Sequence, residues 1–328
     1  MDASGTMRSV VRDVWGGPEV LQIVEVPVPE ITSTQVLVRT RAASVNALDV
    51  HKLDGLPYLI RLAGGLRRPK DRFLGADLAG VVDAVGDEVT RFAPGDEVMG
   101  QSIRTFSDYV GVSEEGLVLK PTSASFDEAA AVPLAGMTAL QALRAAGMRD
   151  GADVLVSGAG GGVGSLAVLL ARALGAATVA ATTRPDALEL VRSLGADDVF
   201  DYTTDALSRV ENRFDVIVDA SGALPTRLIR KLLRRGGIAA IAGLKPGSGQ
   251  VLAPVVRMIG PRPRTWRGTT IVSVATARTT DDLQTLADLL AAGKLPVPID
   301  SRHPIEDAAA ALARTGTGHA NGKVILTF

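Results

Sequence analysis

The sequence predicts an α/β protein in which a β-rich region accompanies a doubly wound parallel sheet. From Met7 to about Pro121, short runs such as VLQIVEVPVP have the composition of strands and are broken by Gly, Pro and Asp turn residues. From about Phe126 to Leu295, strand-like and helix-like segments alternate, which is typical of a parallel sheet with helices on both faces. The chain has 328 residues, about twice a common domain length, so we expect two domains.

These two regions set the expected domain boundaries. The last segment, GHANGKVILTF, ends as another β-like run, which can return to the first region. We therefore expect a β-rich domain from residues 1–124 and 296–328, and a parallel-sheet domain from residues 125–295.

Within the second region, the elements follow one another with the expected punctuation. Apolar and β-branched runs predict strands at residues 153–157, 178–183, 198–202, 214–221 and 238–243. Helical patterns lie between them, at residues 163–174, 185–195, 226–237 and 279–294. Pro185 suits the first position of a helix and Gly195 suits a C-terminal cap, which supports the second of these helices.

The composition favours a small-molecule partner. Lys and Arg total 35 while Asp and Glu total 36, so the net charge of −1 supplies no field for nucleic acid or anionic lipid. The chain contains no cysteine, which excludes disulfides, thiolate catalysis and cysteine-ligated metal sites. There is no signal-peptide pattern and no window of 18 apolar residues, so we expect no membrane insertion and a cytoplasmic location.

A glycine cluster separates a strand from a helix in VLVSGAGGGVGSLAVLLARALGA, residues 154–176. A strand ending at Ser157, a glycine loop and a helix opening near Val163 form the unit that receives the pyrophosphate of a dinucleotide. A tight structural turn is the alternative, but the position within a series of strands and helices favours dinucleotide binding.

Each glycine of this loop has an expected purpose. Gly158 permits the tight turn, Gly161 lets backbone N–H groups approach the phosphates, and Gly164 lets the helix pack close to the strand. The spacing is G-x-x-G-x-x-G rather than the commoner G-x-G-x-x-G. The residues assigned to cofactor binding in this loop are Gly158, Gly161, Gly162, Val163 and Gly164.

The end of the next strand discriminates between cofactors. An NAD-selecting fold places Asp or Glu there to bind the ribose 2′-hydroxyl, whereas a 2′-phosphate requires hydroxyl donors and a cation. Thr182, Thr183 and Arg184 occupy this place. The first acid, Asp186, follows Pro185 inside the expected helix. Because arginine offers a forked donor set to phosphate, NADPH is favoured over NADH, the alternative being a solvated arginine at a helix start.

Several motifs in order along the chain resemble a known superfamily. The first region contains GADLAGVVDAVGDEVTRFAPGDEV at residues 75–98, and AAAVPLAGMTALQAL at residues 129–143 precedes the glycine loop. With the terminal GKVIL, this string resembles the medium-chain dehydrogenase/reductase superfamily, and most closely its zinc-free quinone oxidoreductase, zeta-crystallin-like branch with the enoyl reductases. The resemblance implies a GroES-like catalytic domain, a Rossmann NADPH-binding domain and a homodimer.

Zinc-dependent members of that superfamily carry a cysteine and a histidine as metal ligands in C-G-x-D and G-H-E motifs. At the matching places, this chain has Asn46 and Ala76. Both substitutions remove a ligand, so we expect no catalytic metal. Without a Lewis acid, reduction of a quinone or a polarised double bond is favoured over oxidation of an unactivated alcohol.

The resemblance implies further cofactor contacts. Asn46 matches an asparagine beside the nicotinamide, whose amide is expected to bind the cofactor or the substrate carbonyl, unless it only forms an Asx turn. Thr138 matches a threonine near the nicotinamide and phosphates, with a helix cap as the alternative. Tyr202 matches a tyrosine near the adenosine phosphate, with a half-buried strand residue as the alternative. Loops at the carboxyl ends of later strands add Ser221, Gly243 and Leu244.

The proton donor for such a reduction has three candidates. Tyr58 lies close to where related enoyl reductases carry an active-site tyrosine, and His51 follows Asp49 at the spacing of a proton-relay histidine. Solvent water is the third. A basic stretch over residues 61–72 is expected to be a solvated loop, or else the mouth for an acidic or carrier-bound substrate.

Together these features predict an NADPH-dependent, zinc-independent reductase that transfers hydride to a quinone or to the β-carbon of an α,β-unsaturated carbonyl compound. The small-molecule substrate is expected to be a quinone, an enone or an enoyl compound. Two alternatives stay open: a repurposed, crystallin-like NADPH-binding scaffold, and an alcohol or ketone oxidoreductase that works without metal.

Overall fold

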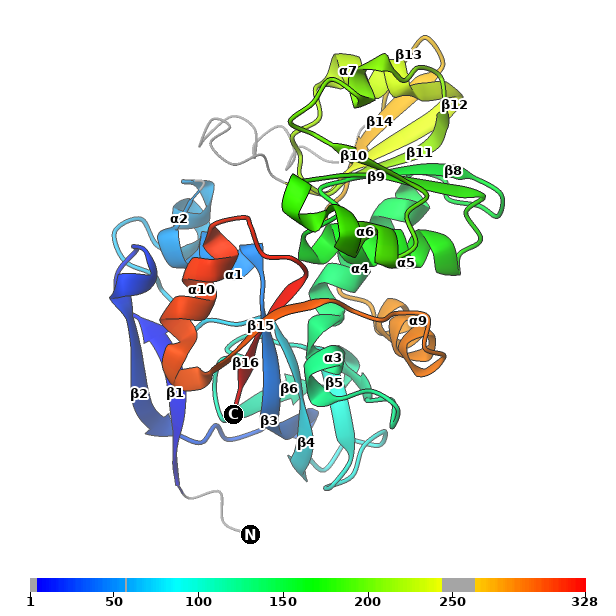
Figure 1. The fold of residues 1–328 in the computed structure, drawn as a ribbon. Coiled ribbons are helices and arrows are strands. Elements are labelled where there is room, and N and C mark those ends of the chain that lie inside the picture. The colour runs from blue at the N-terminus through cyan, green and yellow to red at the C-terminus, as the bar shows by residue number, and fades with distance from the viewer. Residues whose placement is uncertain (1–4, 57, 244–262) are drawn as a thin grey trace. The chain divides into compact units, whose positions relative to one another are not determined.

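The chain forms two compact units in the computed structural model, which describes residues 5–56, 58–243 and 263–328 (Figure 1). Unit 1 comprises Met1–Leu134, Arg278–Ala292 and Ile299–Phe328, and unit 2 comprises Ala135–Ala277 and Gly293–Pro298. None of the described helices is long and apolar enough to cross a membrane.

The units divide the chain at different residues from the expected boundaries at 125 and 295. Helix α3 (Phe126–Ala131) packs on four strands of unit 1, and helix α9 (Thr280–Ala291) packs on another. Both helices were expected in the parallel-sheet domain because their sequences continue its strand–helix alternation. Their apolar faces are covered by unit 1 instead, and pattern alone does not say which sheet a helix covers.

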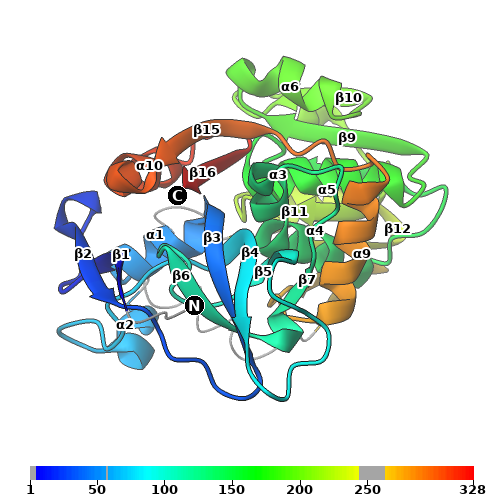
Figure 2. The same ribbon diagram turned by 90° about the horizontal axis from the view of Figure 1, so that it is seen from below.

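Unit 1 contains a seven-stranded sheet in the order β15-β16-β3-β4-β5-β7, with β6 paired to β3 (Figure 2). Its strands are β3 (Gln35–Val45), β4 (Asp77–Val85), β5 (Glu97–Gln101), β6 (Tyr109–Ser113), β7 (Leu117–Leu119), β15 (Ile299–Pro304) and β16 (Lys323–Thr327). A separate antiparallel pair joins β1 (Thr6–Arg12) to β2 (Leu21–Pro27). The predicted return of the terminal run is confirmed, because β16 lies between β15 and β3.

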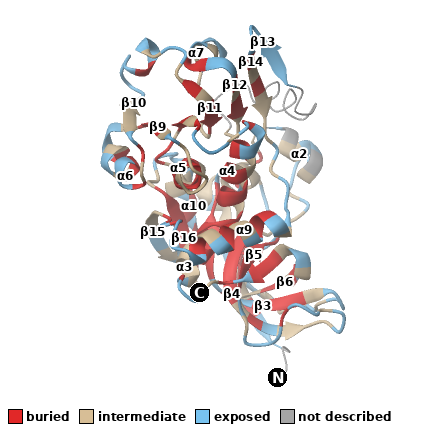
Figure 3. Cartoon of the chain, turned by 90° about the vertical axis from the view of Figure 1, so that its right-hand side faces the viewer, coloured by how far each residue is buried: buried red, intermediate tan, exposed pale blue. Residues whose placement is uncertain are grey.

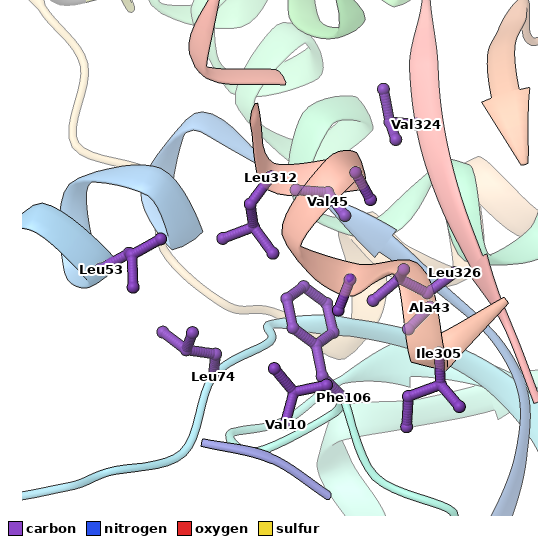
Figure 4. Packing of buried hydrophobic residues seen from close by; sticks show 12 residues of the cluster. Val10, Ala43, Val45, Leu53, Leu74, Phe106, Ile305, Leu312, Val324 and Leu326 are labelled. Carbon is purple, nitrogen blue, oxygen red and sulfur yellow. The ribbon is translucent and has the colours of Figure 1, made fainter. Parts of the chain in front are cut away.

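Three short helices complete unit 1: α1 (Ala47–Asp54), α2 (Leu59–Gly64) and α10 (Ala308–Gly316). The Phe106 ring, which is fully buried, lies among apolar residues of α1, α10, β1, β3 and β16, as Figure 4 shows. A second cluster contains buried residues of β3 and β4, including Val36, Val38 and Leu78. Strands β3 and β4 contain continuous buried runs rather than a strict alternation, so residues on both of their faces are covered.

Unit 2 contains a seven-stranded sheet in the order β10-β9-β8-β11-β12-β14-β13, parallel except for β13. Its strands are β8 (Asp153–Ser157), β9 (Thr178–Thr183), β10 (Asp198–Asp201), β11 (Phe214–Asp219), β12 (Leu233–Ile241), β13 (Arg264–Trp266) and β14 (Thr269–Ser273). The helices are α4 (Pro133–Ala145), whose first two residues belong to unit 1, α5 (Gly162–Ala173), α6 (Leu188–Ser193) and α7 (Thr226–Leu232). The buried residues gather in the strands, in α4 and in α5 (Figure 3).

The doubly wound sheet of unit 2 confirms the predicted fold class, but some of its elements differ from those expected. The helix expected over residues 226–237 stops at Leu232, and β12 begins at Leu233. The register between β12 and β11 shifts early in the strand, and Gly236 has a φ of +89°. Glycine in that conformation cannot continue a helix, so the basic residues before it belong to an irregular strand start.

Candidate active site

The glycine loop of unit 2 has the backbone of a dinucleotide-binding turn. β8 ends at Ser157 and α5 begins at Gly162. Gly158 has a φ of +77°, a conformation that residues with a Cβ rarely adopt. The N–H groups of Gly158 and Ala159 both donate to the carbonyl oxygen of Thr182 on β9, at 3.1 and 2.9 Å. The loop is thereby attached to the neighbouring strand.

Two other positions of the loop are occupied by glycine for different reasons. A Cβ on Gly164 would lie 2.1 Å from the carbonyl oxygen of Gly158, so the helix packs against the loop only because that atom is absent. The close approach at Gly164 is therefore to the loop that follows the strand, whereas the sequence predicted an approach to the strand itself. A Cβ on Gly161 would meet only the same oxygen, at 3.7 Å. Packing among the described residues does not require glycine at 161, whereas close approach of a phosphate to the helix N-terminus would.

The loop after β11 is organised by a buried carboxylate. Asp219, fully buried at the strand end, accepts hydrogen bonds from the Ser221 hydroxyl at 2.8 Å, from Gly222 N at 2.9 Å and from Leu224 N at 3.1 Å. The Ser221 hydroxyl lies 3.1 Å from the Ser157 hydroxyl at the end of β8. Ser221 therefore lies at the carboxyl edge of the sheet beside the glycine loop, as predicted.

Three further residues were predicted to contact the cofactor, and the structure describes two of them, Gly243 and Thr138. Gly243 follows β12, and a Cβ there would lie 1.9 Å from the carbonyl oxygen of Ala220, so only glycine fits this crossing of two loops. Leu244 lies outside the described residues. The Thr138 hydroxyl on α4 lies 2.8 Å from the Thr276 hydroxyl, so its position is set by more than a helix cap.

The end of β9 carries the predicted selectivity residues. Thr182 and Thr183 are 2% and 3% exposed, so of the three residues Arg184 is the one that reaches the surface there. Its guanidinium donates to the carboxylate of Asp186 through Nε at 3.0 Å and through Nη2 at 3.1 Å. The acid that follows Pro185 in sequence is thus a direct partner of the predicted phosphate-binding arginine. Pro185 opens a short 3₁₀ turn, which brings the two side chains together.

Tyr202 follows the last residue of β10 and donates its backbone N–H to the Thr183 carbonyl oxygen at 3.2 Å. Its side chain is 58% exposed, which excludes the half-buried strand residue considered from the sequence. An exposed tyrosine beside the end of β9 is compatible with contact to the adenosine side of a dinucleotide.

In unit 1, the sheet register brings polar residues into a row. The antiparallel register of β16 and β3 continues from their paired residues to Lys323 and Asn46. On β4, Asp77 lies directly opposite Gln101 of β5. Because these strands are adjacent in the order β16-β3-β4-β5, the four side chains lie at one end of the sheet. All four are buried, with exposed fractions between 0% and 7%.

Asp77 is the centre of this row. Its carboxylate accepts hydrogen bonds from four donors: Ser44 Oγ at 2.9 Å, Asn46 Nδ2 at 3.0 Å, Gln101 Nε2 at 3.1 Å and Leu134 N at 3.0 Å. These donors fill the acceptor sites of a carboxylate. The Lys323 ammonium donates to Asn46 Oδ1, so Asn46 bridges the buried cation and the buried anion. We call Lys323, Asn46, Asp77 and Gln101 the polar row.

The polar row fixes the orientation of the Asn46 amide. Its oxygen must face Lys323, a pure donor, and its nitrogen must face Asp77, a pure acceptor. The second N–H of Nδ2 is directed to the carbonyl oxygen of Ser44, at 3.2 Å. Both N–H groups are therefore used inside unit 1, and the amide has none left for a substrate oxygen. The predicted oxyanion contact of Asn46 does not agree with this arrangement. Asn46 also occupies the N-cap of α1 and forms a capping box with Asp49, in keeping with the local turn considered as the alternative.

Burial shifts the pKa values of the ionisable residues in and beside the polar row. Desolvation raises the pKa of Asp77 and lowers the pKa of Lys323, while their mutual attraction opposes both shifts. Desolvation also raises the pKa of Asp49 to about 6. Asp49 Oδ2 accepts from Asn46 N at 2.9 Å, but the buried Oδ1 has no hydrogen-bond partner among the described residues. Asp49 is therefore a buried acid that titrates near neutral pH.

The two predicted proton donors occupy different environments. His51 lies in the last turn of α1, half-buried, and its Nδ1 atom is buried without a partner among the described residues. Tyr58 is 48% exposed and its ring lies under the Arg61 guanidinium, whose carbon is 5.2 Å from the ring centroid. Arg61 is held by the carbonyl oxygens of Asp54 and Gly55. Tyr58 is thus positioned by a stacked, anchored arginine.

The basic stretch over residues 61–72 is only partly solvated. Arg72 pairs with Asp13 at 3.0 Å, and the Arg61 guanidinium lies 5.7 Å from the Trp15 ring centroid. The remaining cations are exposed and have no ion pair among the described residues, namely Arg67, Arg68 and Lys70. The stretch thus has an anchored start and end and a solvated middle.

Sequence reasoning missed the acid and the cation of the polar row. Asp77 was noticed only as part of a motif, and Lys323 only as the second letter of GKVIL. The available indication was a lysine that begins an otherwise apolar strand, because a cation at a buried strand position requires a partner. Asp219 was also missed, although it ends the apolar strand FDVIVD.

Comparison with known proteins places both halves of the chain. A family model of the alcohol dehydrogenase GroES-like domain matches residues 32–141, and a model of zinc-binding dehydrogenases matches residues 194–326. An NADPH-dependent alkenal/one oxidoreductase of Arabidopsis thaliana is 32% identical over 335 residues, covering 98% of this chain and 79% of that protein.

Solved structures agree with these matches. The structure of a quinone oxidoreductase from Coxiella burnetii aligns with a TM-score of 0.83 and 27% identity, covering 98% of this chain and 99% of that one. An NAD-dependent alcohol dehydrogenase aligns with a TM-score of 0.81 and 33% identity, covering 98% of this chain and 100% of that one. The expected GroES-like and Rossmann architecture is confirmed.

One expectation is overturned by the comparison. A cytoplasmic location was expected because the sequence shows no signal peptide. Relatives about 30% identical over nearly the whole chain are described as chloroplast envelope, chloroplastic or mitochondrial oxidoreductases. The expectation of a cytoplasmic location is contradicted by these relatives and is not retained.

Proposed function

Because this chain belongs to the medium-chain dehydrogenase/reductase superfamily, as a quinone oxidoreductase-type protein, we propose that it reduces a quinone or the β-carbon of an α,β-unsaturated carbonyl compound. The protein is an oxidoreductase and its cofactor is NADPH. The observation that carries the proposal is the glycine loop of unit 2, attached to β9 where Arg184 follows the strand. The reductases among its relatives support the choice of acceptor.

In this proposal, unit 2 binds and orients the cofactor. The N–H groups at the start of α5 receive the pyrophosphate, and Arg184 receives the 2′-phosphate. Ser221, Gly243 and Thr138 hold the nicotinamide half at the carboxyl ends of the strands. Bound NADPH supplies the hydride. Proton donation at the α-carbon then falls to Tyr58, His51 or water.

The negative charge that develops on the substrate oxygen needs a donor other than the Asn46 amide, whose N–H groups are used by Ser44 and Asp77. We propose that backbone N–H groups or the cofactor itself supply it, and that Asn46 acts by shaping the start of α1. Asn46→Ala is then expected to alter KM and stability, with a smaller effect on kcat than the loss of a true oxyanion donor, about 10²-fold or more. A kcat loss of that size with unchanged stability would restore the oxyanion role.

We propose that the reaction is independent of zinc. The donor set does not fit the ion: Asn46 and Ala76 stand at the predicted ligand places, and Asp77 is already saturated by four donors. The buried Lys323 ammonium in the same row would repel a second cation. Among the described residues, no group of three His, Cys, Asp or Glu side chains is placed to hold a metal. Dialysis against a chelator should leave activity unchanged, and activity restored by zinc would refute the proposal.

The experiment that tests the proposed function is NADPH oxidation with a panel of quinones, enones and simple ketones. Turnover with quinones or enones supports it. Turnover with alcohols and ketones alone would support the second candidate, a metal-free alcohol oxidoreductase, which the likeness to an alcohol dehydrogenase favours. NADPH binding without oxidation by any acceptor would indicate the scaffold protein instead.

The phosphate role of Arg184 has its own test. Replacing Arg184 by Ala should cost about 1.5–3 kcal/mol of NADPH affinity, the range for a hydrogen bond to a charged group, with little change for NADH. Fluorescence titration of both cofactors measures the difference. Equal losses for the two cofactors would refute contact with the 2′-phosphate.

We propose, too, that two copies form a homodimer through the edge of the unit 2 sheet. β13 lies at the end of the strand order in the part of the chain that the structure describes, and its three residues are exposed. Antiparallel pairing centred on Thr265 would place Arg264 opposite Trp266 of the partner subunit, a favourable cation–π pair. Sedimentation should report a dimer for the native chain and a weaker one for Trp266→Ala. A native monomer would refute this interface.

A further inference from the structure

Arg184, the arginine to which the 2′-phosphate of NADPH is assigned, is already bound by a carboxylate. Asp186 accepts from Nε and Nη2 of this guanidinium, at 3.0 and 3.1 Å, in the side-by-side geometry that arginine also uses for phosphate. The contact lies within unit 2, at the carboxyl end of β9.

The two partners differ in how firmly they are held. The Arg184 side chain is 16% exposed, whereas that of Asp186 is 61% exposed. A packed guanidinium keeps its place, while the more exposed Asp186 carboxylate extends toward solvent. An arriving phosphate would therefore replace the carboxylate and find the arginine already aimed.

From this pair we propose that Asp186 is a specificity-determining residue that competes with the 2′-phosphate of NADPH for Arg184. The proposal rests on the assignment of that phosphate to Arg184. The Asp186 carboxylate occupies the donors of Arg184 that the phosphate would use, and its negative charge must be moved aside when NADPH binds. A cofactor without the 2′-phosphate leaves the pair intact.

The expected consequence is a preference for NADPH over NADH that is weaker than Arg184 would give without Asp186. An exposed ion pair is worth little, so the competition should lower affinity for the phosphorylated cofactor by about two- to fivefold. Removing the carboxylate should recover that factor. Cofactors lacking the phosphate should gain nothing, and NADH should bind equally well or less well.

The experiment compares binding of 2′,5′-ADP, 5′-AMP, NADPH and NADH to the native chain and to Asp186→Asn, by calorimetry or fluorescence. We expect 2′,5′-ADP and NADPH to bind about two- to fivefold more tightly to the variant, with 5′-AMP unchanged. The matched control is Glu189→Gln, which removes one charge from the helix that follows Asp186, since Glu189 pairs with Arg192 instead. Its effect on 2′,5′-ADP should be less than twofold.

A double variant distinguishes direct competition for Arg184 from a long-range effect of the Asp186 charge. In an Arg184→Gln background, Asp186→Asn should no longer improve binding of 2′,5′-ADP, because the shared partner is gone. Persistence of the gain in that background, an equal gain for 5′-AMP, or an equal gain from Glu189→Gln would overturn the competition.

These measurements need no turnover, so they are distinct from the test of the proposed reaction. A native chain that shows the gain but oxidises NADPH with no acceptor would lose the proposed reaction and keep this inference. Equal affinity of the native chain for 2′,5′-ADP and 5′-AMP would overturn the inference together with the phosphate role of Arg184.

Discussion

Replacing Lys323 by Met tests the polar row most directly. The variant keeps the length of the side chain but removes a cation that is 3% exposed. It leaves Asn46 Oδ1 without its donor and leaves the Asp77 charge buried without a nearby opposite charge. Removing one partner of a buried ion pair costs about 3–5 kcal/mol, and the orphaned amide oxygen accounts for about 1–3 kcal/mol of such a loss.

The assay is chemical and thermal unfolding at pH 7.5. At roughly 2–4 °C per kcal/mol for units of this size, the transition of unit 1 should fall by about 10 °C. Lys70→Met is the control, because Lys70 is exposed and has no ion pair among the described residues. Its transition should move by less than about 1 °C, as expected for surface changes.

A double variant decides whether the loss comes from the unpaired charge. If it does, adding Asp77→Asn to Lys323→Met should cost much less than the sum of the two single changes. Additive losses, or a Lys323→Met variant as stable as the Lys70 control, would refute the description of the row as a bridged ion pair.

Three further outcomes are expected. Asp49→Asn should stabilise the protein at pH 7.5 but not at pH 4: burial raises the Asp49 pKa to about 6, so the native state loses stability as pH rises from the unfolded pKa toward 6. The gain should be on the order of 2 kcal/mol, and a pH-independent gain would contradict it. Asp300→Asn should destabilise the protein above pH 4, by about 1–2 kcal/mol, because the hydrogen bond from Arg314 lowers the Asp300 pKa to about 2. The native protein should lose the same free energy of unfolding as the pH falls from 4 toward 2. Urea midpoints across this pH range measure both. Gly164→Ala should abolish NADPH binding or folding, since its Cβ would lie 2.1 Å from a backbone oxygen; normal titration curves would contradict that packing.

The elements of unit 2 were predictable because each carries a local pattern. The strand ending at Ser157, the glycine loop and the helix beyond it all read directly from residue types. The end of the helix near residue 232 was not predictable in the same way, because Leu233 and the two arginines after it suit a helix as well as a strand. Pairing with β11 decided the outcome.

The candidate site of unit 1 could be anticipated only as a list of residues. The sequence places Asn46 in a recognisable motif, but the use of its amide depends on Lys323, which is 277 positions away. That contact follows from the register of β16 against β3, and nothing local encodes it. The contact between Asp186 and Arg184 was likewise hidden, because the sequence predicted a helix where the structure has a 3₁₀ turn.

The place of β16 between β15 and β3 also has a consequence for the order of events during synthesis. Unit 1 gathers segments from both sides of unit 2, whereas residues 135–277 of unit 2 are contiguous. On a growing chain, the second sheet can therefore assemble while the first still lacks a central strand and the cation that faces Asn46. Unit 1, whose first segments are synthesised first, is therefore completed last. Until β16 joins its sheet, the exposed strand edge of β3 and the unpaired Asp77 must be protected from contact with other chains.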